Sequence, residues 1–263
     1  MIDTHTHTHH SPDGASPMAE MAAAALNARL SGIAFTDHAE WYRGDPAYGY
    51  LDLDAYFTEL AATRERFGNN LYILAGVELG NPHDFPAETE SVLTHPFDLV
   101  IGSVHWLDNQ PGWEAPIYQG GIPAAYQLYL GSVLEMIDAA DFDVLGHLDL
   151  MRRDVCDLFG RTVPIEDFRE PVQAVLCRLI ETGRAMEINT SAVRKGLDEP
   201  VPGLTILRWY RELGGELLVI GSDGHMPQDI AHSFDLAREL AKAAGFHRVP
   251  RYAHREVVDW IAL

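Results

Sequence analysis

Short apolar runs alternate with longer amphipathic segments along the whole chain, and this alternation limits the possible folds more than any other feature. The apolar runs lie at residues 1–3, 32–36, 71–77, 97–103, 142–146, 185–189 and 217–222. Helix-like segments lie at residues 16–30, 53–67, 86–94, 122–139, 166–182, 203–213 and 227–244. Strands that alternate with helices and are apolar on both faces predict a parallel sheet covered by helices on both sides.

The ends of several predicted helices carry typical boundary residues. Ser16 and Pro17 precede the first helical segment as a cap and a first-turn proline, and Gly183 and Gly214 follow two later helices. Seven strands, each followed by a helix, predict an α/β barrel with one unit fewer than the common eightfold barrel. An open, doubly wound sheet is the alternative at this point.

Polar residues with metal-binding side chains follow most of the apolar runs. They are Asp3, His5 and His7, then Asp37 and His38, Glu78, His105, His147 and Asp149, Asn189, and finally Asp223 and His225. Six of the seven predicted strands therefore end in a histidine, aspartate or glutamate. An open sheet brings only neighbouring strand ends together, whereas a barrel directs all of them to one mouth. The pattern thus favours a closed barrel with a metal site at the carboxyl ends of its strands.

The ligand types limit the metal and its chemistry. Imidazole and carboxylate groups suit borderline divalent ions such as Zn²⁺, Mn²⁺ and Fe²⁺. So many ligands are too many for one ion and fit two or three, with Glu78 and Asp223 as candidates for bridging carboxylates. Two such ions can share a hydroxide nucleophile and hold the oxygens of a phosphoryl group during an in-line displacement.

The composition excludes several kinds of partner. The chain has 263 residues, is 47% hydrophobic and has a net charge of −20, which disfavours nucleic acids and anionic membranes. No composition shift or linker divides it, so we expect a single catalytic domain over residues 1–263. Two cysteines with no zinc-motif spacing, no signal peptide and no apolar stretch of about 20 residues predict a cytoplasmic protein.

The motifs DTHTHT, FTDH, GVE, GSVH, GHLD and GSDGH, in this order, resemble those of the polymerase and histidinol phosphatase (PHP) superfamily. The stretches IGSVHWLDNQP, DVLGHLDLMRR and MEINTSAVRKG resemble its histidinol-phosphate phosphatase branch, across nearly the whole chain. The resemblance implies a distorted (β/α)7 barrel with a trinuclear metal site. It also implies hydrolysis of L-histidinol phosphate to L-histidinol and phosphate, a late step of histidine biosynthesis.

The resemblance also implies a role for each ligand. The first metal takes His5, His7, Glu78 and Asp223, and Glu78 bridges to a second metal held by His105 and His147. The third metal takes His38, His225 and Asp13. Asp13 stands at a position where many relatives have a histidine. His9 and His10 lie past the first strand, and we expect neither to be needed as a ligand of this centre.

Arginines after the fifth and sixth strands are the candidates for holding phosphate. Arg194 lies in the stretch most like the family's phosphate-binding loop, with Arg153 or Arg152 as its partner. The planar guanidinium group suits a phosphate dianion. His83 and Trp106 are candidates for lining the substrate pocket, whereas His95, His232, His247 and His254 are expected at the surface.

These observations predict a metal-dependent phosphomonoesterase in which a metal-bridging hydroxide attacks phosphorus. Glu78, Asp223 and the arginines are the expected catalytic residues, and no cysteine or serine is placed as a nucleophile. The proton donor to the leaving group stays open between a metal-bound water and Asp149. We expect a small phosphorylated metabolite as the partner and a monomer or homodimer. The alternatives are a nucleotide phosphoesterase or nuclease of the same superfamily, and a non-catalytic metal-binding protein.

Overall fold

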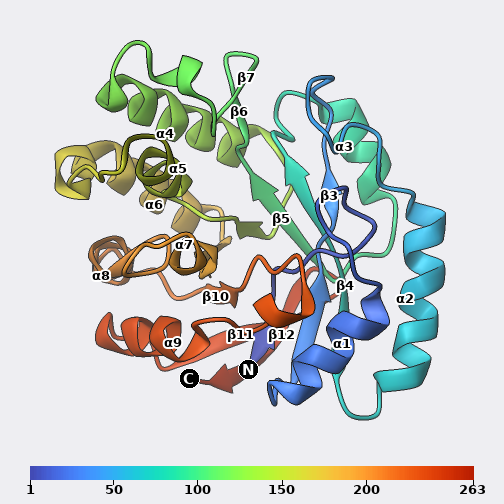
Figure 1. Ribbon diagram of the computed structural model, residues 1–263. Coiled ribbons are helices and arrows are strands. Elements are labelled where there is room, and N and C mark those ends of the chain that lie inside the picture. Colours follow the sequence, from blue (N-terminus) through green and yellow to red (C-terminus); the bar gives the residue numbers. More distant parts are fainter.

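The computed structural model describes residues 1–263, and its central parallel sheet follows the order β1-β2-β4-β5-β8-β9-β10 (Figure 1). The strands are β1 (Ile2–Asp3), β2 (Gly32–Phe35), β4 (Tyr72–Gly80), β5 (Leu99–Ser103), β8 (Val144–Leu145), β9 (Ala185–Asn189) and β10 (Leu218–Gly221). Their spatial order is their chain order, so each helical crossover leads to the adjacent parallel strand. All seven apolar runs therefore contribute a strand to this sheet.

Backbone hydrogen bonds join the first strand region to the last and nearly close the sheet into a barrel. Thr4 N donates to Ile220 O at 3.2 Å, Asp223 N donates to His5 O at 2.8 Å, and His7 N donates to Gly224 O at 2.8 Å. The predicted distorted (β/α)7 barrel is confirmed, and the open sheet is wrong. The barrel is irregular because β1 and β8 have two residues each, whereas β4 has nine.

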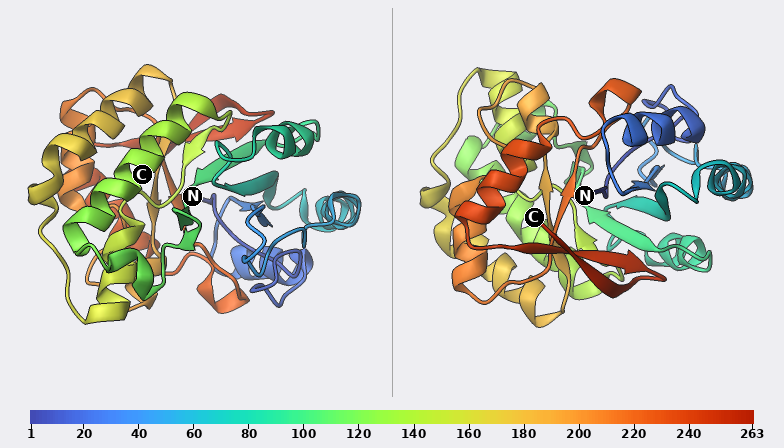
Figure 2. Two further views of the ribbon diagram at one scale, coloured as in Figure 1. Left: turned by 90° about the horizontal axis from the view of Figure 1, so that it is seen from above. Right: turned by 90° about the horizontal axis from the view of Figure 1, so that it is seen from below.

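Helices surround the barrel and bury most of the core against its outer face (Figure 2). They are α1 (Met18–Asn27), α2 (Leu53–Phe67), α3 (Pro86–Leu93), α4 (Ile122–Ala139), α5 (Leu150–Phe159), α6 (Arg169–Glu181), α7 (Ser191–Arg194), α8 (Leu204–Glu212) and α9 (Phe234–Ala243). A smaller apolar cluster contains alternate residues of the strands, among them Leu74, Leu99 and Val219. Because side chains alternate along a strand, Glu78 lies on the same face of β4 as Leu74. One face of the strands is thus apolar at the amino end and charged at the carboxyl end.

Several elements differ from the sequence-based expectations. The predicted helix 227–244 is broken into η3 (Pro227–Asp229) and α9, because Ala231 and Ser233 adopt left-handed backbone angles. The predicted helix 166–182 opens with a 3₁₀ turn, η2 (Ile165–Phe168), and the predicted helix 16–30 is shorter at both ends. The helices α5 and α7 are not predicted from the sequence, and neither are the small elements β3 (His38–Ala39), β6 (Trp106–Leu107), β7 (Gln110–Pro111) and η1 (Ala115–Tyr118).

An antiparallel hairpin that the sequence analysis does not predict ends the described chain. Its strands are β11 (Arg248–Ala253) and β12 (Glu256–Ala262), drawn in red in Figure 2. Tyr252 packs into the apolar cluster that contains Leu74, and Tyr72 Oη donates a hydrogen bond to Tyr252 O at 2.9 Å. The hairpin therefore lies at the amino ends of the barrel strands. No helix of the structure is long and apolar enough to cross a membrane.

Candidate metal centre

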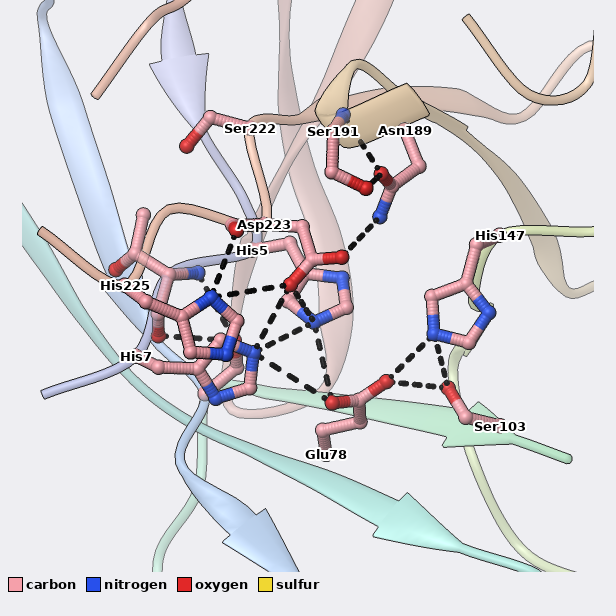
Figure 3. A network of polar contacts seen from close by, with 12 residues as sticks. His5, His7, Glu78, Ser103, His147, Asn189, Ser191, Ser222, Asp223 and His225 are labelled. Atoms are coloured by element: carbon pink, nitrogen blue, oxygen red, sulfur yellow. Dashed lines mark hydrogen bonds and ion pairs between the residues drawn. The ribbon is translucent and has the colours of Figure 1, made fainter. Parts of the chain in front are cut away.

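The carboxyl ends of the strands surround a cavity of about 310 Å³. Its lining includes Asp13, His38, Glu40, Asp45, Glu78, Trp113, His105, His147, Arg153, Asp223 and His225. Figure 3 shows that His5, His7 and His147 point toward Glu78 from different elements, and that Asp223 and His225 join this network above them. The strand-end residues of six different strand units thus meet at one place, as closure of the barrel requires.

The first group of side chains lies at the floor of the cavity, with His5 and His7 fully buried. His5 Nε2 and His7 Nε2 are 3.1 Å apart, His5 Nε2 lies 3.3 Å from Glu78 Oε2, and His7 Nε2 lies 3.4 Å from Asp223 Oδ1. Two imidazole nitrogens and two carboxylate oxygens thus face one another, each at 3.4 Å or less from a neighbour. The arrangement fits a single divalent ion held by two imidazoles and two carboxylates.

The second group uses the other oxygen of Glu78. His147 Nε2 lies 2.9 Å and His105 Nε2 lies 3.3 Å from Glu78 Oε1, and the two histidine nitrogens are 3.4 Å apart. Ser103 Oγ also donates a hydrogen bond to Glu78 Oε1 at 2.6 Å. Glu78 therefore stands between two histidine pairs and presents one oxygen to each, which is the geometry of a bridging carboxylate.

The third group lies nearest to solvent. Asp13 Oδ2 lies 3.0 Å from His225 Nε2 and 3.6 Å from His38 Nε2, and the Asp13 side chain is 53% exposed. The imidazole rings of His38 and His225 each stack on His7, with ring centroids 4.2 Å apart. The carboxylate of Asp13 thus completes a set of two histidines at the cavity mouth.

One buried atom shows that these groups fit metal ions better than they fit hydrogen bonding among themselves. His38 Nδ1 lies 3.0 Å from Glu78 Oε2, yet it is buried without any hydrogen-bond partner. A polar atom in this position is costly unless something satisfies it. A cation between His38 Nδ1 and Glu78 would satisfy both, whereas an ion held by Asp13 would use His38 Nε2, so the ring offers the centre one nitrogen on each side.

The electrostatics of the site keep its carboxylates ionised, while most of its imidazoles hold a proton that a metal would displace. Burial opposes the charge on Glu78, but the nearby imidazoles of His5, His105 and His38 outweigh it and hold the pKa of Glu78 well below its ordinary value. Burial, together with His38 and His225, lowers the pKa of His7 to about 3. Glu78 is therefore ionised and His7 is neutral, as metal ligation requires. In contrast, the carboxylates of Glu40 and Glu78 outweigh burial and raise the pKa of His105 to about 10, so a metal at this position would displace a proton.

Two further carboxylates, neither predicted from the sequence, support the ligands. Glu187 Oε1 lies 2.7 Å from His5 Nδ1, and Glu187 Oε2 accepts a hydrogen bond from His147 N at 2.7 Å. Glu40 Oε1 lies 2.6 Å from His105 Nδ1. A carboxylate on the second ring nitrogen orients a ligating imidazole and raises its basicity. The available signal was a lone glutamate inside the buried apolar run 185–189.

The close packing of these carboxylates requires two glycines. A Cβ atom at Gly221 would collide with Glu187 and with the side chain of His5. A Cβ atom at Gly80 would collide with the carboxylate of Glu40. Both glycines lie in strands that carry the site, so the supporting carboxylates are part of the barrel wall.

Other strand-end acids accept hydrogen bonds from backbone amides and hydroxyl groups and do not line the metal cavity. Asp37 accepts hydrogen bonds from Thr8 N and Ser11 Oγ, and Asp3 accepts them from Ser222 N. Asp149 lies in a separate cavity and accepts a hydrogen bond from Tyr126 Oη at 3.1 Å, while burial raises the pKa of Asp149 to about 7. The structure does not bring Asp149, the candidate proton donor, to the metal cavity.

The candidate arginines separate into two groups. Arg153 lines the metal cavity, with Nη1 3.8 Å from Asp223 Oδ2. Arg194 donates hydrogen bonds from Nη1 to Ser222 O and from Nη2 to Asp223 O, both at 2.7 Å. Arg152 turns into the cavity that contains Asp149, where Nη1 lies 2.6 Å from Glu199 Oε1. Arg153 and Arg194 therefore lie beside the ligands, and Arg152 does not.

The two candidate pocket residues border a different hollow. His83 Nε2 lies 3.2 Å from Ser132 Oγ, and His83 and Trp106 both line a hollow that also contains Tyr42. Trp106 is linked to the metal cavity through Asp45, whose Oδ2 accepts a hydrogen bond from Trp106 Nε1 at 2.8 Å. His83 has no such link. Trp113 and Asp45 line the metal cavity and were not predicted from the sequence.

Comparison with known proteins defines the class to which this fold and site belong. The PHP domain family matches residues 3–191, and the chain belongs to that family. The chain is 30% identical to a probable histidinol-phosphatase of Deinococcus radiodurans, with 98% of both chains covered. It is 26% identical to the histidinol-phosphatase of Lactococcus lactis, over 97% of this chain and 96% of the relative.

A solved structure has the same fold over nearly the whole length. It is the crystal structure of histidinol phosphate phosphatase from Lactococcus lactis, complexed with zinc, L-histidinol and phosphate. It superposes with a TM-score of 0.85 at 24% identity and covers 98% of both chains. At 24% sequence identity, this structural similarity establishes the fold of the chain. The predicted PHP-type barrel is therefore confirmed.

Proposed function

We propose that this protein is a metal-dependent phosphomonoesterase that hydrolyses L-histidinol phosphate to L-histidinol and phosphate. The observation that carries the proposal is the position of Glu78, whose two oxygens face two separate histidine pairs beside Arg153. The histidinol-phosphatase relatives match nearly the full chain, which supports this substrate over other small phosphate esters.

The three groups of ligands fit three divalent ions. His5, His7, Glu78 and Asp223 would hold the first ion, Glu78 with His105 and His147 the second, and Asp13 with His38 and His225 the third. Zinc is the best candidate because it is bound in the Lactococcus lactis structure and suits imidazole and carboxylate ligands. When bound, such ions activate water and neutralise the charge of a phosphate ester.

The arginines of the chain complement the negative charge of the phosphate. Arg153 lies at the cavity wall next to Asp223, where its guanidinium group can hold the non-bridging phosphate oxygens. Arg194 binds the carbonyl groups of Ser222 and Asp223, so it positions the turn that presents the Asp223 carboxylate. Arg153 thus offers positive charge at the cavity where charge develops during phosphoryl transfer, whereas Arg194 does not line the cavity and acts by positioning.

The remaining wall of the cavity is suited to the leaving group. Pro12, Ala47 and Trp113 provide apolar contacts, and Asp45 provides a carboxylate. Asp45 is fixed by hydrogen bonds from Trp106 Nε1 and from Ala47 N, both at 2.8 Å. A flat imidazole ring and a cationic amine, as in L-histidinol, match an aromatic surface with a fixed carboxylate.

The direct test is phosphate release from L-histidinol phosphate by protein supplied with zinc or manganese. A panel of other phosphomonoesters and a short oligonucleotide serve as comparison substrates. We expect L-histidinol phosphate to be the preferred substrate. Efficient turnover of another ester, without turnover of L-histidinol phosphate, would contradict the proposed substrate. The proposal of a metal-dependent phosphoesterase would still hold.

A further inference from the structure

Three side chains form a second cluster of metal-binding type outside the metal cavity. They are His9 and His10, from the loop after β1, and Glu59 of α2. His9 Nε2 lies 2.9 Å and His10 Nε2 lies 2.8 Å from the same oxygen, Glu59 Oε2. None of the three residues lines the metal cavity. The proposed function therefore makes no use of them.

The surroundings of Glu59 hold its carboxylate in position. Glu59 Oε1 accepts a hydrogen bond from Met18 N at 2.9 Å, at the start of α1, a helix that has no side-chain cap of its own. This leaves Oε2 directed at the two histidines. The other end of the cluster is equally fixed, because His9 N donates to Ser16 O at 3.0 Å and His10 N donates to Thr8 Oγ1 at 3.2 Å.

The two adjacent histidines converge although neighbouring side chains in an extended chain point to opposite sides. Their ring centroids are 4.6 Å apart, and the loop turns so that both Nε2 atoms meet at Glu59. The His10 side chain is 8% exposed, whereas that of His9 is 45% exposed. The cluster thus has a buried side and a side open to solvent.

We propose that His9, His10 and Glu59 form a peripheral site for a single zinc ion, separate from the three-ion centre. Two imidazoles and one carboxylate are a common three-ligand set for zinc, with a further position left for water. Zinc bonds to nitrogen and oxygen are about 2.0–2.2 Å long, so the ligand atoms separate slightly to admit the ion. The exposed His9 side chain has the freedom to make this adjustment.

An ion at this site would connect two elements that matter for the main centre. It would cross-link the loop after β1, which also carries Asp13, to the helix α2. Asp13 is the most exposed carboxylate of the ligand groups, and it lies three residues after His10 on the same loop. The peripheral ion would therefore stabilise the loop that brings Asp13 to the cavity mouth.

The test is a zinc titration of full-length protein whose main centre is already filled, followed by calorimetry and metal analysis. The wild type is expected to bind one further zinc equivalent, and His9→Ala is expected to lose it. His9→Ala suits this purpose because the side chain is half exposed, whereas His10 packs edge-on against Tyr56. Glu59→Gln keeps an acceptor for Met18 N and should weaken the site by about tenfold or more.

The matched control is His254→Ala, because the His254 side chain is 89% exposed and lies in the hairpin. This variant should keep the additional zinc equivalent. Equal zinc stoichiometry in wild type and His9→Ala would overturn the proposal. Phosphate release is measured on the same samples at saturating zinc, where mass action fills the main centre even if the loop with Asp13 has lost the support of the peripheral ion. Zinc stoichiometry then tests the peripheral site, and turnover of the wild type tests the main activity.

Discussion

At the carboxyl end of the barrel the strands present histidines and carboxylates, whereas the amino end of the same strands is apolar and covered by the β11–β12 hairpin. On β4 the change occurs between Leu74, in the apolar cluster, and Glu78, at the metal centre. On the last strand it occurs between Val219 and Asp223. One set of strands thus provides a stable closed end and a charged open end.

The two ends also differ in how their charges are compensated. At the amino end Arg255 forms ion pairs with Asp141 at 2.7 Å and with Asp143 at 3.1 Å. The side chain of Asp141 is largely exposed to water. At the carboxyl end Glu78 and Asp223 are buried among histidines, where an uncompensated charge is costly. The comparison indicates that the amino end contributes stability and the carboxyl end depends on bound ions.

The largest effect is expected from Glu78→Gln at the charged end. A neutral amide cannot serve two ions, so phosphate release should fall by on the order of a thousandfold or more, with loss of metal. Activity assays and metal analysis on the purified variant measure both. Glu239→Gln, on the exposed face of α9, is the control and should behave as the wild type. Metal loss without loss of turnover would break the assignment of Glu78.

At the closed end Tyr252→Ala should affect stability and leave chemistry intact. Removal of this buried ring from the apolar cluster should cost about 3 kcal/mol of unfolding free energy, measured by urea denaturation. Activity of the folded, metal-supplied variant should stay close to that of the wild type. Val258→Ala, on the exposed face of β12, provides the control. A large loss of turnover in Tyr252→Ala would show that the two ends are coupled.

Two neighbouring arginines sharpen the comparison at the cavity itself. Arg153→Ala should lower kcat/KM for the phosphate ester by about thirtyfold, or about 2 kcal/mol, because a charged hydrogen-bond donor is lost. Arg152→Ala is the matched control, since Arg152 pairs with Glu199 in a separate cavity. Steady-state kinetics distinguish the two. Equal losses would mean that Arg152 also reaches the substrate.

The smallest effect concerns the ion pair at the closed end. The hydrogen bond from Arg255 lowers the pKa of Asp141, so this pair stabilises the fold above the ordinary carboxyl pKa of about 4. That contribution is lost as the pH falls through the lowered pKa of the folded state. Because Asp141 is largely exposed, Asp141→Asn should cost at most about 1 kcal/mol at neutral pH. Urea unfolding at neutral and acidic pH should show the difference shrinking in acid.

Local periodicity explains why much of the fold and the ligand set follows from the sequence. An apolar run that ends in a polar residue places that residue at a strand end whatever the rest of the chain does. Closure of the barrel then brings those ends together. His38, Glu78, His105 and His147 meet in the structure for this reason.

The sequence leaves the rotation of helices and the partners of buried acids undetermined. Arg152 and Arg153 are adjacent on α5, where successive side chains point about 100° apart, and only packing decides which one faces the cavity. The pairing of Glu187 with His5 joins residues from β9 and the loop after β1, so no local pattern reports it. The hairpin was likewise missed because β12 is mostly exposed and lacks a clear apolar run.

The sequence by itself therefore determined the (β/α)7 architecture and the residues at the strand ends, since both depend on short-range periodicity. Of the two candidate bridging carboxylates, the tertiary structure selected Glu78 as the one that stands between two histidine pairs. It also decided that Arg153 faces the cavity and that His9 and His10 turn away to Glu59. These features depend on barrel closure and on contacts between segments far apart in the chain. No local pattern in the sequence encodes such contacts.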